Sequence, residues 1–336
     1  MIREALLYEK TDNMRAQCNL CAHRCAISPD KRGICGVREN KDGVLYSLVY
    51  GTLVAENIDP IEKKPFFHVL PGSLSYSIAT PGCNFACAFC QNHEISQMPR
   101  ATRMIAGDEV SPEDIVRQAK KSGCKTIAYT YTEPTIYFEL AYDTAKIAHA
   151  FDIKNVFVTN GFMTPEAIEM ISPYLSAANV DLKSFRDEFY KKQCGAKLAP
   201  VLDSVKKMKS LGIWLEITTL LIPTLNDSEE ELKDIAEFIA SLGNEIPWHI
   251  SRFHPQFKRR ELPPTPLSSL HKAMETGKKA GLKHVYCGNV PGDQGENTYC
   301  SNCNHLLIER YGFRIGSASL NGNKCSNCGT KLDGIF

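Results

Sequence analysis

Three cysteines within eight residues constrain this chain more than any other feature. The stretch TPGCNFACAFCQNHEIS, residues 80–96, spaces Cys83, Cys87 and Cys90 as C-x3-C-x2-C and offers no fourth cysteine nearby. A structural zinc ion is enclosed by four ligands, whereas an iron–sulfur cube held by three thiolates keeps one iron open for another ligand. With an aromatic residue, Phe89, just before the last cysteine, the motif favours a [4Fe–4S] cluster over a zinc site that lacks a distant ligand.

The charge of the chain argues against two classes of partner. Its 336 residues carry 39 Lys and Arg against 38 Asp and Glu, so no basic footprint indicates nucleic acid or an anionic membrane face. The N-terminus, MIREALLYEKTDN, interrupts its apolar residues with charges, and no run approaches the ~18 apolar residues of a membrane span. With 43% hydrophobic residues the chain can bury a sizeable core. We expect a soluble, cytoplasmic protein.

Most of the 14 cysteines fall in three tight clusters, and clustering indicates metal binding more often than disulfides. Besides the central motif, the N-terminal and C-terminal regions each supply four thiols. Three isolated cysteines are expected to be small buried hydrophobic residues. The N-terminal thiols are Cys18, Cys21, Cys25 and Cys35, the C-terminal thiols are Cys300, Cys303, Cys325 and Cys328, and the isolated ones are Cys124, Cys194 and Cys287.

The two terminal clusters allow different metals. The C-terminal pairs, C-S-N-C at 300–303 and 325–328, enclose a strand-like stretch at 305–310, a pattern typical of a zinc ribbon. A rubredoxin-type iron and disulfides are the alternatives, and a zinc there would mainly stabilise a module too small for its own core. The N-terminal x2, x3, x9 spacing suits a structural zinc, which we favour, or a second four-iron cluster, because both accept four thiolates.

Over residues 76–253, short apolar strands alternate with helical segments. Three helices have clear starts, at Ser111, Thr164 and Ser228, each an N-cap followed by acidic residues in the first turn. Such a series forms either an open doubly wound sheet or a full or partial barrel. In both folds the chemistry lies at the carboxyl ends of the strands. The expected strands are 76–79, 126–130, 155–159, 179–182, 214–221 and 249–253.

Polar residues follow five of these strands, and we expect them to meet at one rim. The asparagine and glycine at 160–161 can also form a simple turn, and His254 can be an ordinary loop histidine. Glu133 and Asp181 are stronger candidates, because each interrupts an apolar strand with a charge. Besides the cysteine motif, the segments are Tyr131-Thr132-Glu133-Pro134, Thr159-Asn160-Gly161, Asp181-Leu182-Lys183 and Arg252-Phe253-His254-Pro255.

Together these motifs resemble the radical S-adenosylmethionine (radical SAM) enzymes over about residues 75–289, in particular the branch of the pyruvate formate-lyase activating enzyme. Four stretches are similar, over nearly the whole chain, to the radical SAM component of the AmmeMemoRadiSam system. They are CNLCAHRC at 18–25, GICGVR at 33–38, the central motif with Gln91-Asn92, and YTYTEP at 129–134.

The resemblance implies an α/β fold with three parts. Residues 71–292 would form a partial (β/α)6 barrel of the TIM type. Residues 1–70 would form a small Cys-rich metal-binding segment with short strands, and residues 293–336 a zinc-ribbon or rubredoxin-like module.

The resemblance also implies the cofactor contacts. Cys83, Cys87 and Cys90 would ligate a [4Fe–4S] cluster whose unique iron takes the amino and carboxylate groups of S-adenosylmethionine. Glu133, with Thr132, stands where the family has a GGE-like motif for the methionyl ammonium, and an anion there suits a cation. Tyr131 and Thr132 occupy the places of two usual glycines, so the backbone approaches less freely. The other implied contacts are the backbone of Phe89 and the side chains of Asn160, Asp181, Lys183 and His254.

Three functions stay open. The first is reductive cleavage of S-adenosylmethionine to methionine and a 5′-deoxyadenosyl radical, which abstracts hydrogen from a protein or small molecule. The second is an activase that installs a glycyl radical in a partner enzyme. The third, an iron–sulfur electron carrier without S-adenosylmethionine chemistry, would need neither Glu133 nor Asp181. The resemblance further implies a flavodoxin-type or ferredoxin-type electron donor and an association with AMMECR-like or Memo-like proteins. The motifs do not identify the substrate.

Overall fold

An eight-stranded sheet forms the centre of the computed structural model, which describes residues 1–336. Seven strands run parallel, each beside the next along the chain, and β8 joins one edge antiparallel to β9. Because the strand order never reverses, the sheet is a partial barrel and not a doubly wound sheet. From edge to edge the strands are β8 (Ala55–Pro60), β9 (Leu74–Ala79), β11 (Thr126–Tyr129), β12 (Lys154–Thr159), β13 (Leu175–Asp181), β14 (Trp214–Leu221), β15 (Trp248–Arg252) and β16 (Val285–Gly288).

All six predicted strands are present, but the sheet has two more. The strand β16 adds a seventh parallel strand, and its apolar run is only three residues long, Val285 to Cys287, before Gly288. The strand β8 carries Glu56, Asn57 and Ile58 exposed, as an edge strand can, so it lacks the apolar run of a buried strand. Neither strand has a local sequence pattern from which it could be predicted.

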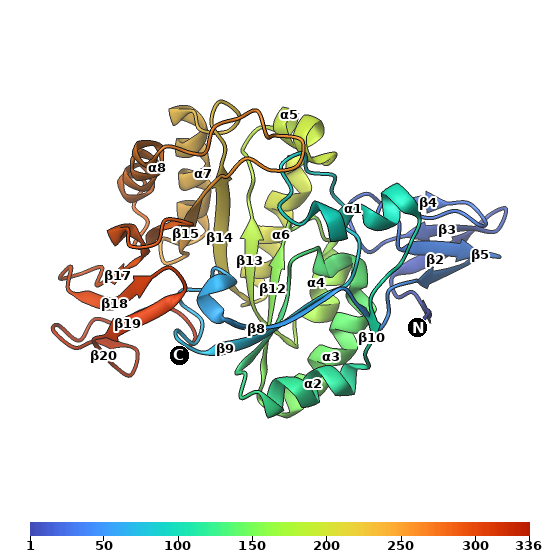
Figure 1. The fold of residues 1–336 in the computed structure, drawn as a ribbon, viewed down its shortest axis with the longest axis horizontal. Helices are drawn as coiled ribbons and strands as arrows, with labels where there is room; N and C mark the ends of the chain where they lie inside the picture. The colour runs from blue at the N-terminus through green and yellow to red at the C-terminus, as the bar shows by residue number, and fades with distance from the viewer.

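Helices between the strands cover the sheet (Figure 1). Three begin as the sequence predicted, since the side chains of Ser111, Thr164 and Ser228 each accept a hydrogen bond from the backbone N–H three residues on, at 3.1–3.3 Å. Each bond satisfies an N–H that has no partner inside the helix. The helices are α1 (His93–Thr102), α2 (Pro112–Lys121), α3 (Phe138–Ala150), α4 (Pro165–Ile171), α5 (Asp187–Phe189), α6 (Leu198–Ser210), α7 (Glu229–Leu242) and α8 (Leu267–Lys279), with short 3-10 turns η1 (Ile61–Lys63), η2 (Pro134–Tyr137) and η4 (Gln294–Glu296) and a π-turn η3 (Tyr190–Cys194).

Small antiparallel sheets flank the barrel at opposite ends of the molecule (Figure 1). The stretch expected at 305–310 forms β18, and the short strands expected within residues 1–70 are present. At the N-terminal end the strands are β1 (Arg3–Glu4), β2 (Tyr8–Thr11), β3 (Arg15–Cys18), β4 (Ala26–Ile27), β5 (Arg38–Lys41), β6 (Val44–Ser47) and β7 (Thr52–Leu53), the last paired with β10 (Asp108–Glu109). At the C-terminal end they are β17 (Thr298–Tyr299), β18 (Leu306–Tyr311), β19 (Arg314–Ala318), β20 (Leu320–Asn321) and β21 (Lys324–Cys325).

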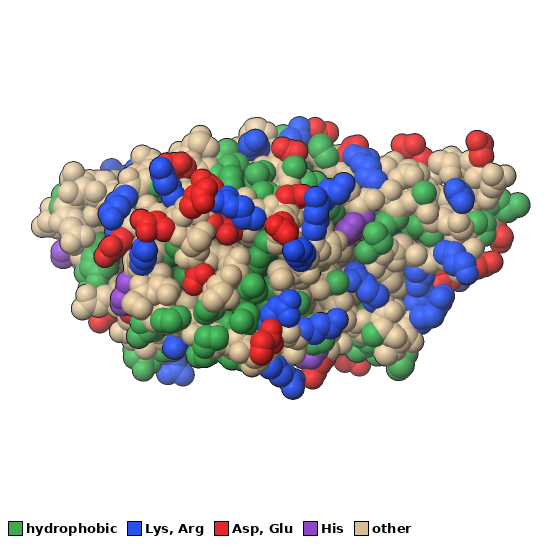
Figure 2. All heavy atoms as spheres, turned by 90° about the horizontal axis from the view of Figure 1, so that it is seen from above, with side chains coloured by type: hydrophobic (Ala, Val, Ile, Leu, Met, Phe, Trp, Pro, Cys, Tyr) green, Lys and Arg blue, Asp and Glu red, His purple; other side chains and the backbone are tan.

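The hydrophobic core shows how these parts are joined. One cluster of 67 buried residues runs from the N-terminal strands through the barrel, so the N-terminal segment shares the barrel's core. The C-terminal strands enclose a separate cluster of only five buried residues. The isolated Cys124, Cys194 and Cys287 are buried, as predicted. None of the helices is both long and apolar enough to cross a membrane, and Figure 2 shows basic and acidic side chains interspersed over one face.

A buried ion pair ties the N-terminal segment to the barrel. Arg38, at the start of β5, pairs with Glu139 in the first turn of α3, and their side chains are only 2% and 1% exposed. Both partners also hold the backbone of Leu6, whose N–H donates to Glu139 at 2.8 Å and whose carbonyl accepts from Arg38 at 3.3 Å. Because a buried charge has lost its hydration, removing one partner costs more than the pair itself contributes.

Replacing Glu139 with Gln should therefore lower the free energy of unfolding by about 3–5 kcal/mol, since the buried guanidinium of Arg38 would lose the carboxylate with which it is paired. Denaturant unfolding followed by circular dichroism measures the change. Glu237→Gln is the matched control, because Glu237 pairs with Lys233 on the surface, where ion pairs contribute little. Equal losses in the two variants would contradict an anchoring role for the buried pair.

Candidate functional site

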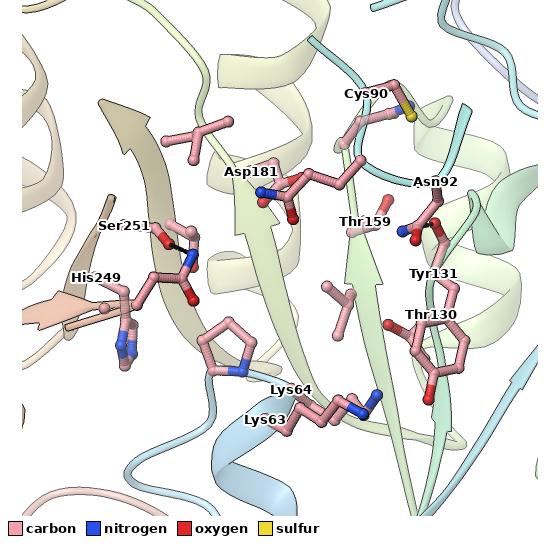
Figure 3. A pocket seen from close by; sticks show the side chains of 18 of the residues that line it. Lys63, Lys64, Cys90, Asn92, Thr130, Tyr131, Thr159, Asp181, His249 and Ser251 are labelled. Atoms are coloured by element: carbon pink, nitrogen blue, oxygen red, sulfur yellow. Dashed lines mark hydrogen bonds between the residues drawn. The ribbon is translucent and has the colours of Figure 1, made fainter. Parts of the chain in front are cut away.

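A cavity of about 450 Å³ opens at the carboxyl ends of the parallel strands and continues along the inside of the sheet. In Figure 3, Cys90 and Asp181 lie near the arrowheads of the strands, whereas Lys63 and Lys64 lie toward the opposite end, at η1. Nine of the ten residues that the sequence and the resemblance single out for the cluster and its cofactor line this cavity. The tenth, His254, is exposed and does not line it.

The loop after β9 carries the three cysteines of the central motif. The thiol of Cys83 accepts a hydrogen bond from the N–H of Phe85 at 3.3 Å, and the thiol of Cys90 lies 3.3 Å from the hydroxyl of Ser96. Gly82, just before Cys83, has φ +110°, and a Cβ there would lie 2.7 Å from the side chain of Val37. Only glycine combines this backbone conformation with so close an approach, so the loop is pressed against the N-terminal segment.

The arrangement of these three thiols fits a cluster better than a single metal ion. All three line the cavity, and the three sulfurs do not all lie within 4.8 Å of one another. Around one zinc ion with Zn–S bonds of ~2.3 Å, tetrahedral geometry brings the sulfurs to about 3.8 Å. In a four-iron cube each thiolate binds a different corner, so the sulfurs stand farther apart. The spacing of the three thiols is therefore compatible with a [4Fe–4S] cluster.

A fourth thiol, missed by the sequence analysis, lies beside the motif. Cys194, at the end of η3, is buried, and its thiol, together with the charge of Lys183, lowers the pKa of Cys87 despite the burial of Cys87. Burial instead raises the pKa values of Cys83 and Cys90. No local pattern marks Cys194, because it stands alone in the sequence and reaches the site only through the fold.

Backbone contacts also join η3 to the motif. The N–H of Ala86 donates to the carbonyl of Cys194, and the N–H of Ala88 donates to that of Gln193, both at 2.8 Å. The two segments therefore form a single support for the thiols.

A half-buried lysine provides positive charge at the same place. Lys183, just after β13, pairs with Asp181 at 2.8 Å. Burial alone would lower the pKa of Lys183, but the charges of Asp181, Cys87 and Cys194 hold it well above its usual value. The ammonium group of Lys183 lies 6.0 Å from the ring centre of Phe89. A permanent cation beside the thiolates offsets part of their negative charge.

Glu133 is the buried carboxylate of the site, only 1% exposed. Its Oε1 accepts from the N–H and the hydroxyl of Thr135 at 3.1 and 2.5 Å and from the hydroxyl of Thr159 at 2.7 Å. Its Oε2 accepts only from the N–H of Asn160, at 2.8 Å, and so keeps acceptor capacity. Burial raises the pKa of Glu133, although these donors favour the carboxylate.

Two further predicted residues fasten strand ends to the cysteine loop. The side-chain amide of Asn160 donates to the side-chain oxygen of Asn84 at 2.7 Å, and the hydroxyl of Thr132 donates to the carbonyl of Thr80 at 2.8 Å. The side chain of Thr132 thus acts on the loop, and that of Asn160 lies beside Cys83.

Tyr131 adopts the backbone conformation of a glycine. Its φ is +60°, a region that costs a residue with a Cβ about 1–2 kcal/mol. Three contacts hold it there: its hydroxyl donates to Asp59 at 2.5 Å, its carbonyl accepts from the amide of Asn92 at 2.7 Å, and Lys64 lies 4.0 Å from its ring centre. Asp59 and Lys64, which precede β9, thus help to hold Tyr131 in a backbone conformation that glycine adopts more easily.

No sequence motif marks the part of the cavity that lies near η1, away from the cysteines. Lys63 and Lys64 both pair with Asp59, at 2.8 and 2.7 Å, and burial lowers the pKa of Lys64 to about 8. His249 contacts the buried Glu216 at 2.6 Å. These residues belong to η1 and to the inside of strands, where no motif marks them. They give the cavity a second polar region away from the cysteines.

The terminal cysteines form two further groups. The sulfurs of the four C-terminal cysteines, Cys300, Cys303, Cys325 and Cys328, all lie within 4.8 Å of one another, so this group could hold a metal ion. The four N-terminal cysteines line a small enclosed cavity of their own.

Comparisons with known proteins agree with this geometry. The model of the radical SAM superfamily matches residues 77–239. An uncharacterized protein of Methanocaldococcus jannaschii is 46% identical over 335 residues, which cover 99% of each chain. The pyruvate formate-lyase-activating enzyme of Clostridium pasteurianum is 23% identical over 170 residues, 48% of this chain and 68% of that protein.

The fold is shared with a solved radical SAM methyltransferase from Sphaerobacter thermophilus, at a TM-score of 0.50 and 15% identity, covering 67% of this chain and 70% of that one. The matched family model begins in β9 and includes the cysteine loop and the strand ends that form the cavity. The chain therefore belongs to the radical SAM superfamily and is an enzyme of that superfamily.

Proposed function

We propose that Cys83, Cys87 and Cys90 hold a [4Fe–4S] cluster and that S-adenosylmethionine binds beside it in the 450 Å³ cavity. The observation that carries this proposal is the convergence of three separated thiols and one buried carboxylate, Glu133, on a single cavity. With the cofactors bound, such a site supplies a 5′-deoxyadenosyl radical by one-electron cleavage of S-adenosylmethionine. The substrate, a protein or a small molecule, would lose a hydrogen atom to that radical.

The chain's own residues bind and orient the cofactor. The free acceptor capacity of Glu133 Oε2 suits the methionyl ammonium, because a charge-assisted hydrogen bond in a dry site is strong. Asp181 and Lys183, both lining the cavity, offer a carboxylate and an ammonium to polar groups of the nucleoside and the amino acid. The backbone of Phe89 lies at the same wall and would contact the adenine.

Space beyond the cofactor contacts is available for a substrate. The part of the cavity near Lys63 and Lys64 is lined by residues that none of the predicted cofactor contacts uses. The lining of the cavity combines these polar side chains with the aromatic ring of Phe313, and it suits a substrate with both a polar and an apolar part.

A second candidate is the activation of a partner enzyme by forming a glycyl radical in it. The observation in its favour is the similarity to a pyruvate formate-lyase-activating enzyme. The resemblance to the AmmeMemoRadiSam system instead suggests an AMMECR-like or Memo-like protein as the partner, with a flavodoxin or ferredoxin as electron donor. A stable protein radical on the partner, formed only with reductant and S-adenosylmethionine, would distinguish the activase.

We also propose that the C-terminal thiols bind zinc. The sulfurs of Cys300 and Cys328 lie 3.6 Å apart and those of Cys303 and Cys325 lie 3.7 Å apart, close to the ~3.8 Å edge of a tetrahedral zinc–thiolate site. The residue after each C-S-N-C segment, Asn304 or Gly329, has a positive φ that turns the chain around the thiols. With only five buried residues in its core, this region depends on such a site for its stability.

Replacing Cys83, Cys87 and Cys90 together with Ala should remove one four-iron cluster and abolish the reductive cleavage of S-adenosylmethionine, because no ligands would remain for the cluster. Chromatographic detection of 5′-deoxyadenosine after anaerobic incubation with dithionite measures the reaction. Cys124→Ala, a buried cysteine outside the clusters, is the control. Formation of 5′-deoxyadenosine by the triple variant would refute the proposed cluster site.

Glu133→Gln should keep the iron content and weaken S-adenosylmethionine binding by about 1.5–3 kcal/mol, because a charge-assisted hydrogen bond becomes a neutral one. That loss corresponds to a roughly 10- to 150-fold higher Kd, measurable by anaerobic equilibrium dialysis. Glu296→Gln is the matched control, since Glu296 is a buried carboxylate that lines the same cavity but binds two backbone N–H groups. Unchanged affinity in Glu133→Gln would restrict Glu133 to its contacts with the strand ends.

Replacing Cys303 and Cys328 with Ser should remove one zinc ion per chain and lower the thermal stability of the C-terminal region, because structural zinc contributes directly to folding. Metal analysis and thermal unfolding measure the two effects, with Cys287→Ser as the control. An iron–thiolate absorption spectrum from this site, or full zinc content in the variant, would contradict a zinc site.

A further inference from the structure

The four N-terminal thiols surround a small enclosed cavity between the N-terminal strands and η2. Apolar side chains form much of its wall, among them Leu20, Ile27 and Ile136. Cys18, Cys21, Cys25 and Cys35 all line this one cavity, so the four thiols gather around the same space. A small cavity lined by four thiols offers the ligands for a thiolate-bound metal group.

The spacing of these sulfurs differs from that of a single-ion site. No three of the four N-terminal sulfurs lie within 4.8 Å of one another, whereas all four C-terminal sulfurs do. The N-terminal thiols in this respect match the central motif, whose three sulfurs are also more widely spaced. One zinc ion requires sulfurs about 3.8 Å apart, but a four-iron cube separates its ligands at four corners.

Arg38 supplies a second, independent indication of a ligand. It lines the cavity, is only 2% exposed, and its Nε has no hydrogen-bond partner. Its NH1 and NH2 groups are engaged by Leu6 and Glu139. A buried N–H without a partner is costly, and an anionic group inside the cavity would satisfy it. Four thiolates around either Zn²⁺ or an oxidised [4Fe–4S] core carry a net charge of −2, so charge suits both and the spacing decides between them.

We propose that Cys18, Cys21, Cys25 and Cys35 ligate a second [4Fe–4S] cluster, complete with four thiolates and therefore closed to S-adenosylmethionine. The spacing of these four cysteines along the sequence allows either zinc or a cluster, and the sequence analysis favoured zinc. The wide spacing of the sulfurs and the unpartnered Nε of Arg38 favour the cluster.

The N-terminal cysteine segment contacts the loop that carries the central cysteine motif. The side chain of Arg100 donates to the carbonyls of both Ile34 and Cys83, at 3.0 and 3.1 Å, and so bridges the two cysteine segments. The carbonyl of Cys35 lies 3.4 Å from the point that a Cβ on Gly82 would occupy. His23 contacts the carbonyl of Asn84 at 2.8 Å. The segments that carry the two groups of thiols are therefore in direct contact.

This position suits the transfer of single electrons, a role that rests on the proposed function of the central site. A one-electron carrier protein of the flavodoxin or ferredoxin type would reduce the N-terminal cluster by one electron. That electron would pass to the central cluster, which reoxidises the N-terminal one and supplies the single electron consumed for each S-adenosylmethionine cleaved.

Metal analysis of the Cys83/Cys87/Cys90→Ala variant, reconstituted anaerobically with iron and sulfide, tests the second site. We expect one four-iron cluster, seen by Mössbauer spectroscopy and, after reduction, by electron paramagnetic resonance, together with one zinc ion. Adding Cys18→Ser and Cys35→Ser should remove this iron while the C-terminal zinc remains, and an unchanged circular dichroism spectrum would show that the chain is still folded. Two zinc ions and no cluster in the first variant would overturn the proposal.

The wild-type protein separates this inference from the proposed function. If it forms 5′-deoxyadenosine while the triple variant holds only zinc, the second cluster is refuted and the central site stands. In reduced wild-type protein we expect magnetic coupling between two clusters that is absent from the triple variant. Cys18→Ser with Cys35→Ser should also lower the rate of 5′-deoxyadenosine formation with reduced flavodoxin several-fold relative to the rate with dithionite, and an unchanged ratio would overturn the electron-transfer role.

Discussion

The buried carboxylate of Glu133 is the interaction on which the rest of the site depends. It stands just beyond the end of β11 and accepts hydrogen bonds from Thr159 and from the N–H of Asn160 at the end of β12. Asn160 in turn holds Asn84, next to Cys83. A single desolvated charge thus fixes two strand ends and the cysteine loop relative to one another. Its remaining acceptor capacity is directed to whatever occupies the cavity, so the group that organises the site is also placed to bind the cofactor.

Much of this arrangement could be predicted from the sequence, because it rests on local signals. Buried parallel strands appear as short apolar runs, helix starts appear as N-caps, and polar residues after the strands mark the rim. What could not be predicted depends on contacts between distant segments. Cys194 reaches Cys87 only because η3 packs on the cysteine loop. Lys64 and Asp59 reach Tyr131 because β8 pairs with β9, a pairing that no local pattern announces.

The sequence also does not determine which metal each of the three cysteine clusters binds. Each has a spacing along the sequence that several metals accept, and in the two terminal clusters the number of thiols is the same. The fold separates them: the C-terminal sulfurs lie as close as around one ion, whereas the N-terminal and central sulfurs do not. The cores differ in the same way: the C-terminal strands have a small core of their own, whereas the N-terminal segment shares the core of the barrel. The C-terminal group would serve to stabilise its own strands, whereas the N-terminal and central groups lie on segments that contact each other.

The central claim is that the cluster held by Cys83, Cys87 and Cys90 has one iron open to S-adenosylmethionine. Electron–nuclear double resonance on the reduced wild-type protein, with S-adenosylmethionine labelled with ¹⁵N at the amino group and ¹⁷O at the carboxylate, tests it most directly. The account predicts that both labels couple to the cluster's electron spin, since both atoms would bind the open iron. Bound S-adenosylmethionine without coupling from either label would contradict the account, because the fourth iron would then have another ligand.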